Sequence, residues 1–468
     1  MINRVWTFHA FAGRARSSPP VPAARAAGER FGYGWRTARL ARGSAAAMVI
    51  YAAGAGLTYC AQLVVARAIG AGGYGVYAYV LAWITVLAYV SALGFDVSLL
   101  RFVPAYLAHP AVPLLRGVIQ YASRRVAAVG CGIALIGIAV VLVQFKVLAP
   151  ALANAFLVGF AVVPIAALLW VYAAVVRGFG GVVSALAPDR MIRDGVLVGL
   201  VLLASMVAGW TIDAAWAMAA TLLGSAIGLG VVSLAMRRLR PAALDGVAPV
   251  YDAQTWRQTA LPLVIIRAAE ALMNRTGVML LAWMVDAKSA GIYAVAFSIA
   301  FAVTLPRTAV NALLAPEISD LFVRGDRAAL QSVVAKAASW TLLGAAGIAL
   351  PVAVFAHPLL ALFGRDFQAG VPALRILIVG QVIAAAAGSQ LHLMNMTGRE
   401  RSAAVLLASS AAVNAALGAA LVTGLGLTGA ALAATMAVIG WNAAMGLSIR
   451  RHLRLLPGIL AAWPDKAR

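Results

Sequence analysis

Residues 126–145 read VAAVGCGIALIGIAVVLVQF, a run of twenty residues without a charged side chain. A helix needs about 20 mostly apolar residues to cross the hydrocarbon core of a bilayer. Eleven further segments have a similar length and apolar character. The sequence therefore predicts an all-α polytopic membrane protein with twelve spans, at residues 45–66, 76–95, 126–145, 152–176, 191–208, 214–236, 259–284, 291–312, 333–356, 371–392, 403–423 and 427–448.

The composition indicates the same class of protein. The chain has 468 residues, of which 63% are hydrophobic and 11% charged, whereas soluble proteins are about 45–50% apolar and about 25% charged. Its net charge of +22 would suit a nucleic-acid-binding protein. However, the Lys and Arg residues lie in short clusters between apolar runs, so we expect no nucleic-acid partner. Cys60 and Cys131 fall in different apolar runs, where we expect small core residues and no disulfide.

The positions of the basic residues predict how the chain crosses the membrane. Most of the 37 Lys and Arg residues fall in segments on one side, and such segments stay in the cytoplasm. Both termini are therefore predicted to be cytoplasmic. The exceptions are the basic residues of the predicted outer loops and of the spans themselves, namely Arg67, Lys146, Lys288 and Arg365 in the loops and Arg267, Arg275, Arg307 and Arg375 in the spans.

A short repeat divides the chain into two halves. Residues 71–78 and 287–294 share the pattern Ala-x-x-x-Gly-apolar-Tyr-Ala, and each follows the first span of its half. Halves that cross the membrane in the same direction imply a pseudo-two-fold axis along the membrane normal, as in many transporters. We therefore expect two six-helix lobes. The predicted division is a basic N-terminal arm (1–43), an N-terminal lobe (44–236), a cytoplasmic linker (237–258), a C-terminal lobe (259–449) and a basic cytoplasmic tail (450–468).

Short motifs in both halves, in their order and spacing, resemble one family of membrane proteins. They include Ala66-Arg67-Ala-Ile-Gly70, Gly73-Tyr74-Gly75-Val-Tyr77, Leu93-Gly94-Phe95-Asp96 and Arg101-Phe102-Val-Pro104 in the first half, and Gly291-Ile-Tyr293, Pro316-Glu317-Ile318-Ser319, Leu362-Phe363-Gly364, Met396-Thr397-Gly398 and Gly426-Leu-Thr-Gly429 in the second. From residue 44 to about 450 the chain resembles the polysaccharide transporter family, the O-antigen-type flippases of the multidrug/oligosaccharidyl-lipid/polysaccharide (MOP) superfamily.

This resemblance implies a function. Such a protein moves an undecaprenyl-pyrophosphate-linked oligosaccharide from the cytoplasmic to the periplasmic leaflet of a bacterial inner membrane, by alternating access. The product supplies O-antigen, capsule or exopolysaccharide biosynthesis. Membrane lipids and other polysaccharide-assembly proteins are expected partners, and H⁺ or Na⁺ is a candidate coupling ion. The resemblance does not identify the glycan.

Charged residues inside the spans are the candidate substrate site, because an ionisable group at mid-bilayer costs about 2.5–3.5 kcal/mol. In span 259–284, Arg267, Glu270 and Asn274 fall within roughly 60° of one helix face, and Arg275 lies beside this stripe. Two arginines against one glutamate leave a net positive charge, and the planar fork of Arg suits phosphate oxygens. We expect these residues to line a cationic central cavity. The alternative is that Arg267 and Glu270 form an internal structural pair.

Arg307 and Arg375 are further candidates for substrate binding. Each lies about five residues from the end of its span, so its side chain can instead reach the membrane interface.

Two other functions compete with this interpretation. A multidrug or cation antiporter of the same superfamily needs buried carboxylates, and only Glu270 is predicted deep in a span, whereas Asp96 and Asp194 are placed at span borders. A membrane enzyme needs acid–base or nucleophilic groups beside its substrate, and no such arrangement is apparent. We therefore expect a transporter rather than an enzyme, with no cofactor and no metal. Whether Glu270 binds a coupling ion or only pairs with Arg267 stays open.

Overall fold

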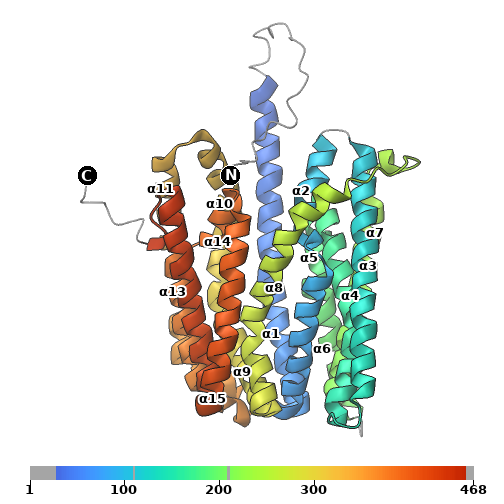
Figure 1. Ribbon diagram of the computed structural model, residues 1–468, viewed down its shortest axis with the longest axis vertical. Helices are drawn as coiled ribbons and strands as arrows, with labels where there is room; N and C mark the ends of the chain where they lie inside the picture. Colours follow the sequence, from blue (N-terminus) through green and yellow to red (C-terminus); the bar gives the residue numbers. More distant parts are fainter. Residues whose placement is uncertain (1–27, 109–110, 208–210, 460–468) are drawn as a thin grey trace, which may run out of the picture. The chain divides into compact units, whose positions relative to one another are not determined.

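The computed structural model describes residues 28–108, 111–207 and 211–459, which form only helices and the turns between them (Figure 1). Most of the predicted arm, up to residue 27, and the end of the predicted tail lie outside the described residues. The first half contains α1 (Gly28–Ser91), α2 (Phe95–Ala108), α3 (Val112–Val143), α4 (Pro150–Gly178), α5 (Val182–Ala187), a π-helix (Pro188–Ile192), α6 (Arg193–Met206) and α7 (Ala214–Leu239).

The second half contains α8 (Ala253–Met284), α9 (Ala287–Phe301), α10 (Leu305–Arg324), α11 (Arg327–Val354), α12 (Ala356–Ala361), α13 (Val371–Ala387), α14 (Gln390–Met396) and α15 (Glu400–Leu453). Short 3₁₀ helices lie at Ala242–Leu244, Ala302–Thr304 and Arg365–Gly370. From residue 46 onward the long helices run side by side in one bundle (Figure 1).

Two of the long helices each account for two predicted spans. Gly70 breaks α1 with φ of 70°, and Gly426 breaks α15 with φ of 52°. Glycine adopts these left-handed conformations without a steric penalty. The parts on either side of each break are long enough to cross a bilayer. Eight helical segments satisfy the length and hydropathy expected of a span, and both broken segments are among them.

The remaining two spans are helices that simple hydropathy misses. α8 is long enough but carries Arg257, Arg267, Glu270 and Arg275. The other is formed by α5, the π-helix and α6, which join without leaving the right-handed helical conformation. This span begins at Val182 rather than at residue 191 as predicted, because Pro188 is accommodated within a π-turn instead of ending the helix. The prediction of twelve helices is confirmed.

The loop predicted at residues 96–125 is also helical. It consists of α2 and the first turns of α3, so nearly all of the described residues in this predicted loop are helical.

The two halves pack as two lobes. In the first, α4 contacts α2, α3 and α7, and α6 contacts α7; in the second, α15 contacts α8 and α13, and α11 contacts α10 and α13. The repeat motifs of the two lobes meet each other. A Cβ atom added to Gly75 would collide with the carbonyl oxygen of Ala287, and one added to Gly291 would collide with the carbonyl oxygen of Ala71.

This contact is reciprocal, because Ala71 and Gly75 correspond to Ala287 and Gly291 in the repeat. A two-fold axis between the lobes produces such an exchange of equivalent contacts. The glycines are required there because the two helix backbones touch. The repeat therefore marks the place where the lobes meet.

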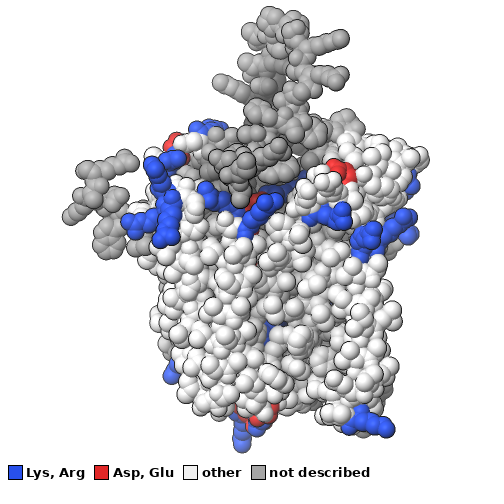
Figure 2. Space-filling model, in the orientation of Figure 1, with Lys and Arg blue, Asp and Glu red and all other residues white. Residues whose placement is uncertain are grey.

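The apolar core differs between the two ends of the bundle. Around the glycine contact, a single cluster of buried residues includes both lobes, with Tyr74 and Tyr77 from the first and Tyr293, Leu360 and Phe367 from the second. Toward the other end, each lobe has a separate cluster built mainly from its own helices. We call the first the glycine end and the second the basic end, because Lys and Arg side chains gather there (Figure 2).

The predicted linker is ordered and packs against the N-terminal lobe. Arg116 of α3 donates hydrogen bonds to the carbonyl oxygens of Leu244 and Val247, at 3.1 and 2.7 Å. Trp256, at the start of α8, is fully buried and donates to the hydroxyl of Tyr106 at 3.0 Å. The linker therefore fixes the start of the second lobe to α2 and α3.

The surface of the bundle suits a lipid environment. In Figure 2 a broad band below the basic end is almost free of charged side chains. Large apolar residues are exposed in this protein, including Leu135 at 67%, Val143 at 86% and Leu350 at 70%. A soluble protein would not expose such an extent of apolar surface. Cys60 and Cys131 are also exposed, so the expectation that they are core residues is wrong.

Candidate functional site between the lobes

Arg267 of α8 connects the two lobes. Its Nε donates to Asp96 Oδ2 at 3.1 Å, and its Nη1 donates to Glu270 Oε2 at 3.3 Å. Its guanidinium carbon lies 4.3 Å from the centre of the Tyr89 ring, in a cation–π contact. Asp96 and Tyr89 belong to the first lobe and Glu270 to the second. We call these four residues and Arg307 the Arg267 cluster.

A tight turn between α1 and α2 brings Asp96 to this place. Leu93 and Gly94 both adopt positive φ, at 52° and 73°. A Cβ atom on Gly94 would collide with the carbonyl oxygen of Ala260, so the turn rests directly on the backbone of α8. α2 then begins at Phe95 and places Asp96 in its first turn, where the helix dipole favours a carboxylate.

Arg307 completes the balance of charge in the cluster. It is half-buried on α10 and lies close enough to Glu270 to interact electrostatically. The cluster therefore contains two arginines and two carboxylates. This changes the expected surroundings of Arg267, because Asp96 adds a second carboxylate beside it that helix geometry alone did not indicate.

Arg275 is in a different environment from Arg267. Eight residues separate the two, which is about 12 Å along the helix. Arg275 is half-buried and makes no ion pair or hydrogen bond with any residue that the structure describes. Asn274 beside it is also half-buried. Tyr74, Tyr77, Tyr89 and Arg193, all from the first lobe, lie within electrostatic reach of Arg275.

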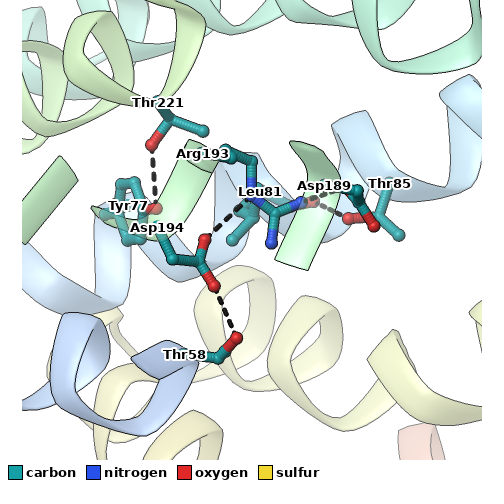
Figure 3. A network of polar contacts seen from close by, with 8 residues as sticks. All are labelled: Thr58, Tyr77, Leu81, Thr85, Asp189, Arg193, Asp194 and Thr221. Atoms are coloured by element: carbon teal, nitrogen blue, oxygen red, sulfur yellow. Dashed lines mark hydrogen bonds and ion pairs between the residues drawn. The ribbon is translucent and has the colours of Figure 1, made fainter. Parts of the chain in front are cut away.

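Arg193 belongs to a polar network that sequence reasoning missed (Figure 3). It donates to Asp194 Oδ1 at 2.9 Å and to Asp189 Oδ1 at 3.0 Å. Thr58 of α1 donates to the other oxygen of Asp194. Nearby, the hydroxyls of Tyr77 and Thr221 lie 3.0 Å apart. The network thus ties the π-helix and α6 to α1, with α7 alongside.

The missed network had a recognisable signal in the sequence. Asp189 and Arg193 are four residues apart, a spacing that forms pairs on a helix. The predicted span begins at residue 191, so Arg190 and Arg193, at its start, count with the preceding cytoplasmic segment, and Asp194 lies at the border of the span. The structure places all of them within one continuous helix, and Asp194 is only 4% exposed. Asp96 is also buried, so two more carboxylates lie inside the protein than the sequence indicated.

The predicted site residues therefore divide into three groups. Arg267, Glu270 and Arg307 are brought together, and Arg275 and Asn274 lie farther along α8. Arg375 is exposed on α13 and contacts none of the others among the described residues. A pocket of about 380 Å³ between α6 and α7 is lined by apolar residues such as Leu200, Trp216 and Leu223, and by none of the predicted site residues. The described His, Cys, Asp and Glu residues form no group of three that could hold a metal ion.

Twelve helices in two lobes related by a two-fold axis, with charged groups enclosed between them, define a multi-pass membrane transporter. Residues 40–322 match the family model described as "Polysaccharide biosynthesis protein". The match covers more than half of the chain, and the chain belongs to this family. A comparison with curated proteins finds no match.

Solved structures of the MOP superfamily share the fold. An inward-facing multidrug resistance MATE family transporter superimposes with a TM-score of 0.70 and 14% identity, over 85% of this chain and 94% of the other. The lipid II flippase MurJ, in an inward closed conformation, gives 0.66 and 14%, over 86% and 87%. A mutant of the Vibrio cholerae MATE transporter VcmN gives 0.62 and 18%, over 89% and 96%. The TM-scores show a common fold, and sequence identities this low carry no information on the substrate.

Proposed function

We propose that the protein is a flippase that moves an undecaprenyl-pyrophosphate-linked oligosaccharide from the cytoplasmic to the periplasmic leaflet of a bacterial inner membrane. The family supports a role in polysaccharide assembly, and one neighbour in fold is a lipid II flippase. The basic end is the cytoplasmic one in this proposal, with both termini there. The protein carries out no covalent chemistry, and a gradient of H⁺ or Na⁺ is a candidate driving force.

The environment of Arg275 is the observation that supports the proposal most directly. Arg275 is half-buried and forms no ion pair with a carboxylate among the described residues. An arginine without such a partner is costly inside a membrane, so it is retained where an anion can neutralise it. Arg275 lies within electrostatic reach of tyrosines of the first lobe. A pyrophosphate group between the lobes would supply the missing negative charge and would accept hydrogen bonds from the guanidinium fork. Asn274, beside Arg275 on α8, offers a further polar group to the same ligand.

The alternative is a multidrug or cation antiporter, and two observations favour it. The MATE transporters share the fold, and the side chains of Asp96 and Asp194 are buried, in addition to the half-buried Glu270. However, each of these three carboxylates already pairs with an arginine. None is left to bind a cationic drug unless its arginine moves away. We therefore prefer an anionic substrate.

Deleting the gene distinguishes the two functions. The flippase proposal predicts that a lipid-linked oligosaccharide accumulates in the inner leaflet and that one surface polysaccharide disappears. Extracted lipids and surface glycans would be compared between the deletion strain and a complemented strain. Normal surface glycans together with increased drug sensitivity would contradict the proposal and support the antiporter.

A further inference from the structure

The two ends of the bundle are closed by different kinds of contact. At the glycine end, the lobes share one apolar core and touch through the backbones of Gly75 and Gly291. At the basic end, ion pairs cross between the lobes: Asp96 with Arg267, and Arg101 with Glu400 at 3.0 Å. An anionic ligand can compete for an ion pair, but it cannot compete for a glycine contact.

Of these two ion pairs, Asp96–Arg267 is the one better suited to hold the lobes together. The Asp96 side chain is 6% exposed, whereas Arg101 is 55% exposed to its surroundings. An exposed pair contributes little to stability, and a buried carboxylate depends strongly on its partner. Oδ1 of Asp96 has no hydrogen-bond partner among the described residues, so Arg267 supplies the only side-chain hydrogen bond that this carboxylate receives from them.

We propose that Asp96 is a positioning residue, which holds Arg267 in a latch across the lobes until the anionic headgroup of the substrate takes its place. The inference rests on the proposed function. Phosphate oxygens and a carboxylate offer the same kind of acceptor to a guanidinium. When pyrophosphate binds Arg267, Asp96 loses its partner. The charged carboxylate of Asp96 is then more stable in contact with water than buried in the protein. The basic ends of the lobes then separate, while the glycine end stays closed.

The charges left behind in the second lobe remain in balance. Glu270 keeps Arg307 nearby, and the substrate neutralises Arg267. Asp96, by contrast, forms no ion pair with a second arginine among the described residues. When the latch opens, Arg267 and the bound substrate therefore stay with the C-terminal lobe, and Asp96 moves away with the N-terminal lobe.

Cysteine labelling tests the latch without measuring transport. Val97 follows Asp96, is half-buried and packs against the apolar cluster of the opposite lobe, so opening of the latch would expose it further. A Val97→Cys reporter would be introduced after Cys60 and Cys131 are replaced. A membrane-impermeant maleimide would be applied at the basic end, in inverted vesicles. Asp96→Asn should accelerate labelling by about tenfold, since coupling between contacting charges commonly shifts a two-state equilibrium by that order.

Two matched variants separate the latch from a general loss of charge. Glu400→Gln removes the exposed ion pair between the lobes and should change labelling by less than about twofold. Glu270→Gln removes a partner of Arg267 within one lobe and should have a similarly small effect. In Asp96→Asn/Arg267→Gln, labelling should equal that of Asp96→Asn alone, because the two changes remove one contact. If Asp96→Asn is not recovered in the membrane, Asp96→Glu should give intermediate labelling.

Addition of farnesyl pyrophosphate distinguishes failure of the latch from failure of the proposed function. It should accelerate labelling of the wild type and leave Asp96→Asn unchanged. Labelling of Asp96→Asn at the wild-type rate would overturn the latch and leave the flippase proposal intact. If Asp96→Asn labels faster but farnesyl pyrophosphate has no effect on the wild type, the latch is supported and the pyrophosphate substrate is contradicted.

Discussion

Arg267 and Arg275 lie on the same helix, yet their surroundings give them different roles. Arg267 has two carboxylates and an aromatic ring as partners, whereas Arg275 faces tyrosines and another arginine. In this structure Arg267 joins the two lobes through its ion pairs, whereas Arg275 has no ion pair among the described residues. Substitutions at the two positions should therefore differ in their effects on export and on the amount of folded protein.

Arg275→Gln should reduce glycan export by at least tenfold while the membrane level of the protein stays normal. Its loss leaves no buried carboxylate unpaired among the described residues, so folding is spared. Arg275→Lys should recover only part of the export, because an ammonium keeps the charge and loses the planar fork. Surface glycan per molecule of protein measures both. Arg375→Gln is the control, since Arg375 is exposed, and its export should be close to normal.

Arg267→Gln should instead lower the amount of folded protein. It leaves Asp96 buried without a partner, which costs about 3–5 kcal/mol when no other group compensates. Glu270→Gln should be milder, because Glu270 is 33% exposed and Arg267 retains Asp96. Membrane level and thermal stability in detergent would be measured for both. Equal losses in the two variants, with normal export per remaining molecule, would instead support a purely structural Arg267–Glu270 pair.

At this scale the sequence predicts local pairs and misses distant ones. Arg267 and Glu270 are three residues apart, so helix geometry alone brings them together. Asp96 is 171 residues from Arg267, and no periodicity connects them. The contact depends on the strained turn at Leu93 and Gly94, which only the folded structure reveals. The same reason explains why Arg193 was not linked to Arg275.

At the scale of helices, glycine and proline determine which span boundaries can be predicted from the sequence. Gly70 and Gly426 divide α1 and α15 at the positions where hydropathy predicts span ends, so those spans could be predicted. Pro188 suggests a helix start, but the helix continues through it as a π-turn. Gly224 of α7 permits this, because an added Cβ would lie 2.6 Å from the carbonyl oxygen of Arg193. A bulge accommodated by a neighbouring helix leaves no local signal in the chain.

The repeat motif offers a prediction about helix packing. Gly75→Ala should destabilise the protein by about 1–3 kcal/mol, the usual effect of overpacking, because the new methyl group meets the backbone of the other lobe. Gly291→Ala should have a similar effect by symmetry. Gly72→Ala is the matched control within the same motif, since nothing lies within 4 Å of its added Cβ. Thermal unfolding in detergent would be compared, and equal stability of Gly75→Ala and Gly72→Ala would contradict the lobe contact.

At the scale of the whole molecule, the distribution of charge predicts orientation. Single cysteines at residues 146–151, 286–290 and 357–370 should react with an impermeant reagent from the periplasm. Those at 105–115 and 240–250 should react only from the cytoplasm. The placement of Arg190 and Arg193 inside a span removes two residues from the cytoplasmic count and leaves its strong bias intact. Periplasmic labelling near residue 245 would contradict the two-lobe scheme.

The central claim is that the protein itself moves a lipid-linked oligosaccharide across a bilayer. Purified protein would be placed in liposomes that carry this lipid, isolated from a deletion strain, in one leaflet. With a proton or sodium gradient imposed, exposure of the glycan to an impermeant glycosidase would be followed over time. The account predicts rapid redistribution between leaflets with the wild type and at least tenfold slower redistribution with Arg275→Gln. Equal rates in protein-free, wild-type and Arg275→Gln liposomes would contradict it.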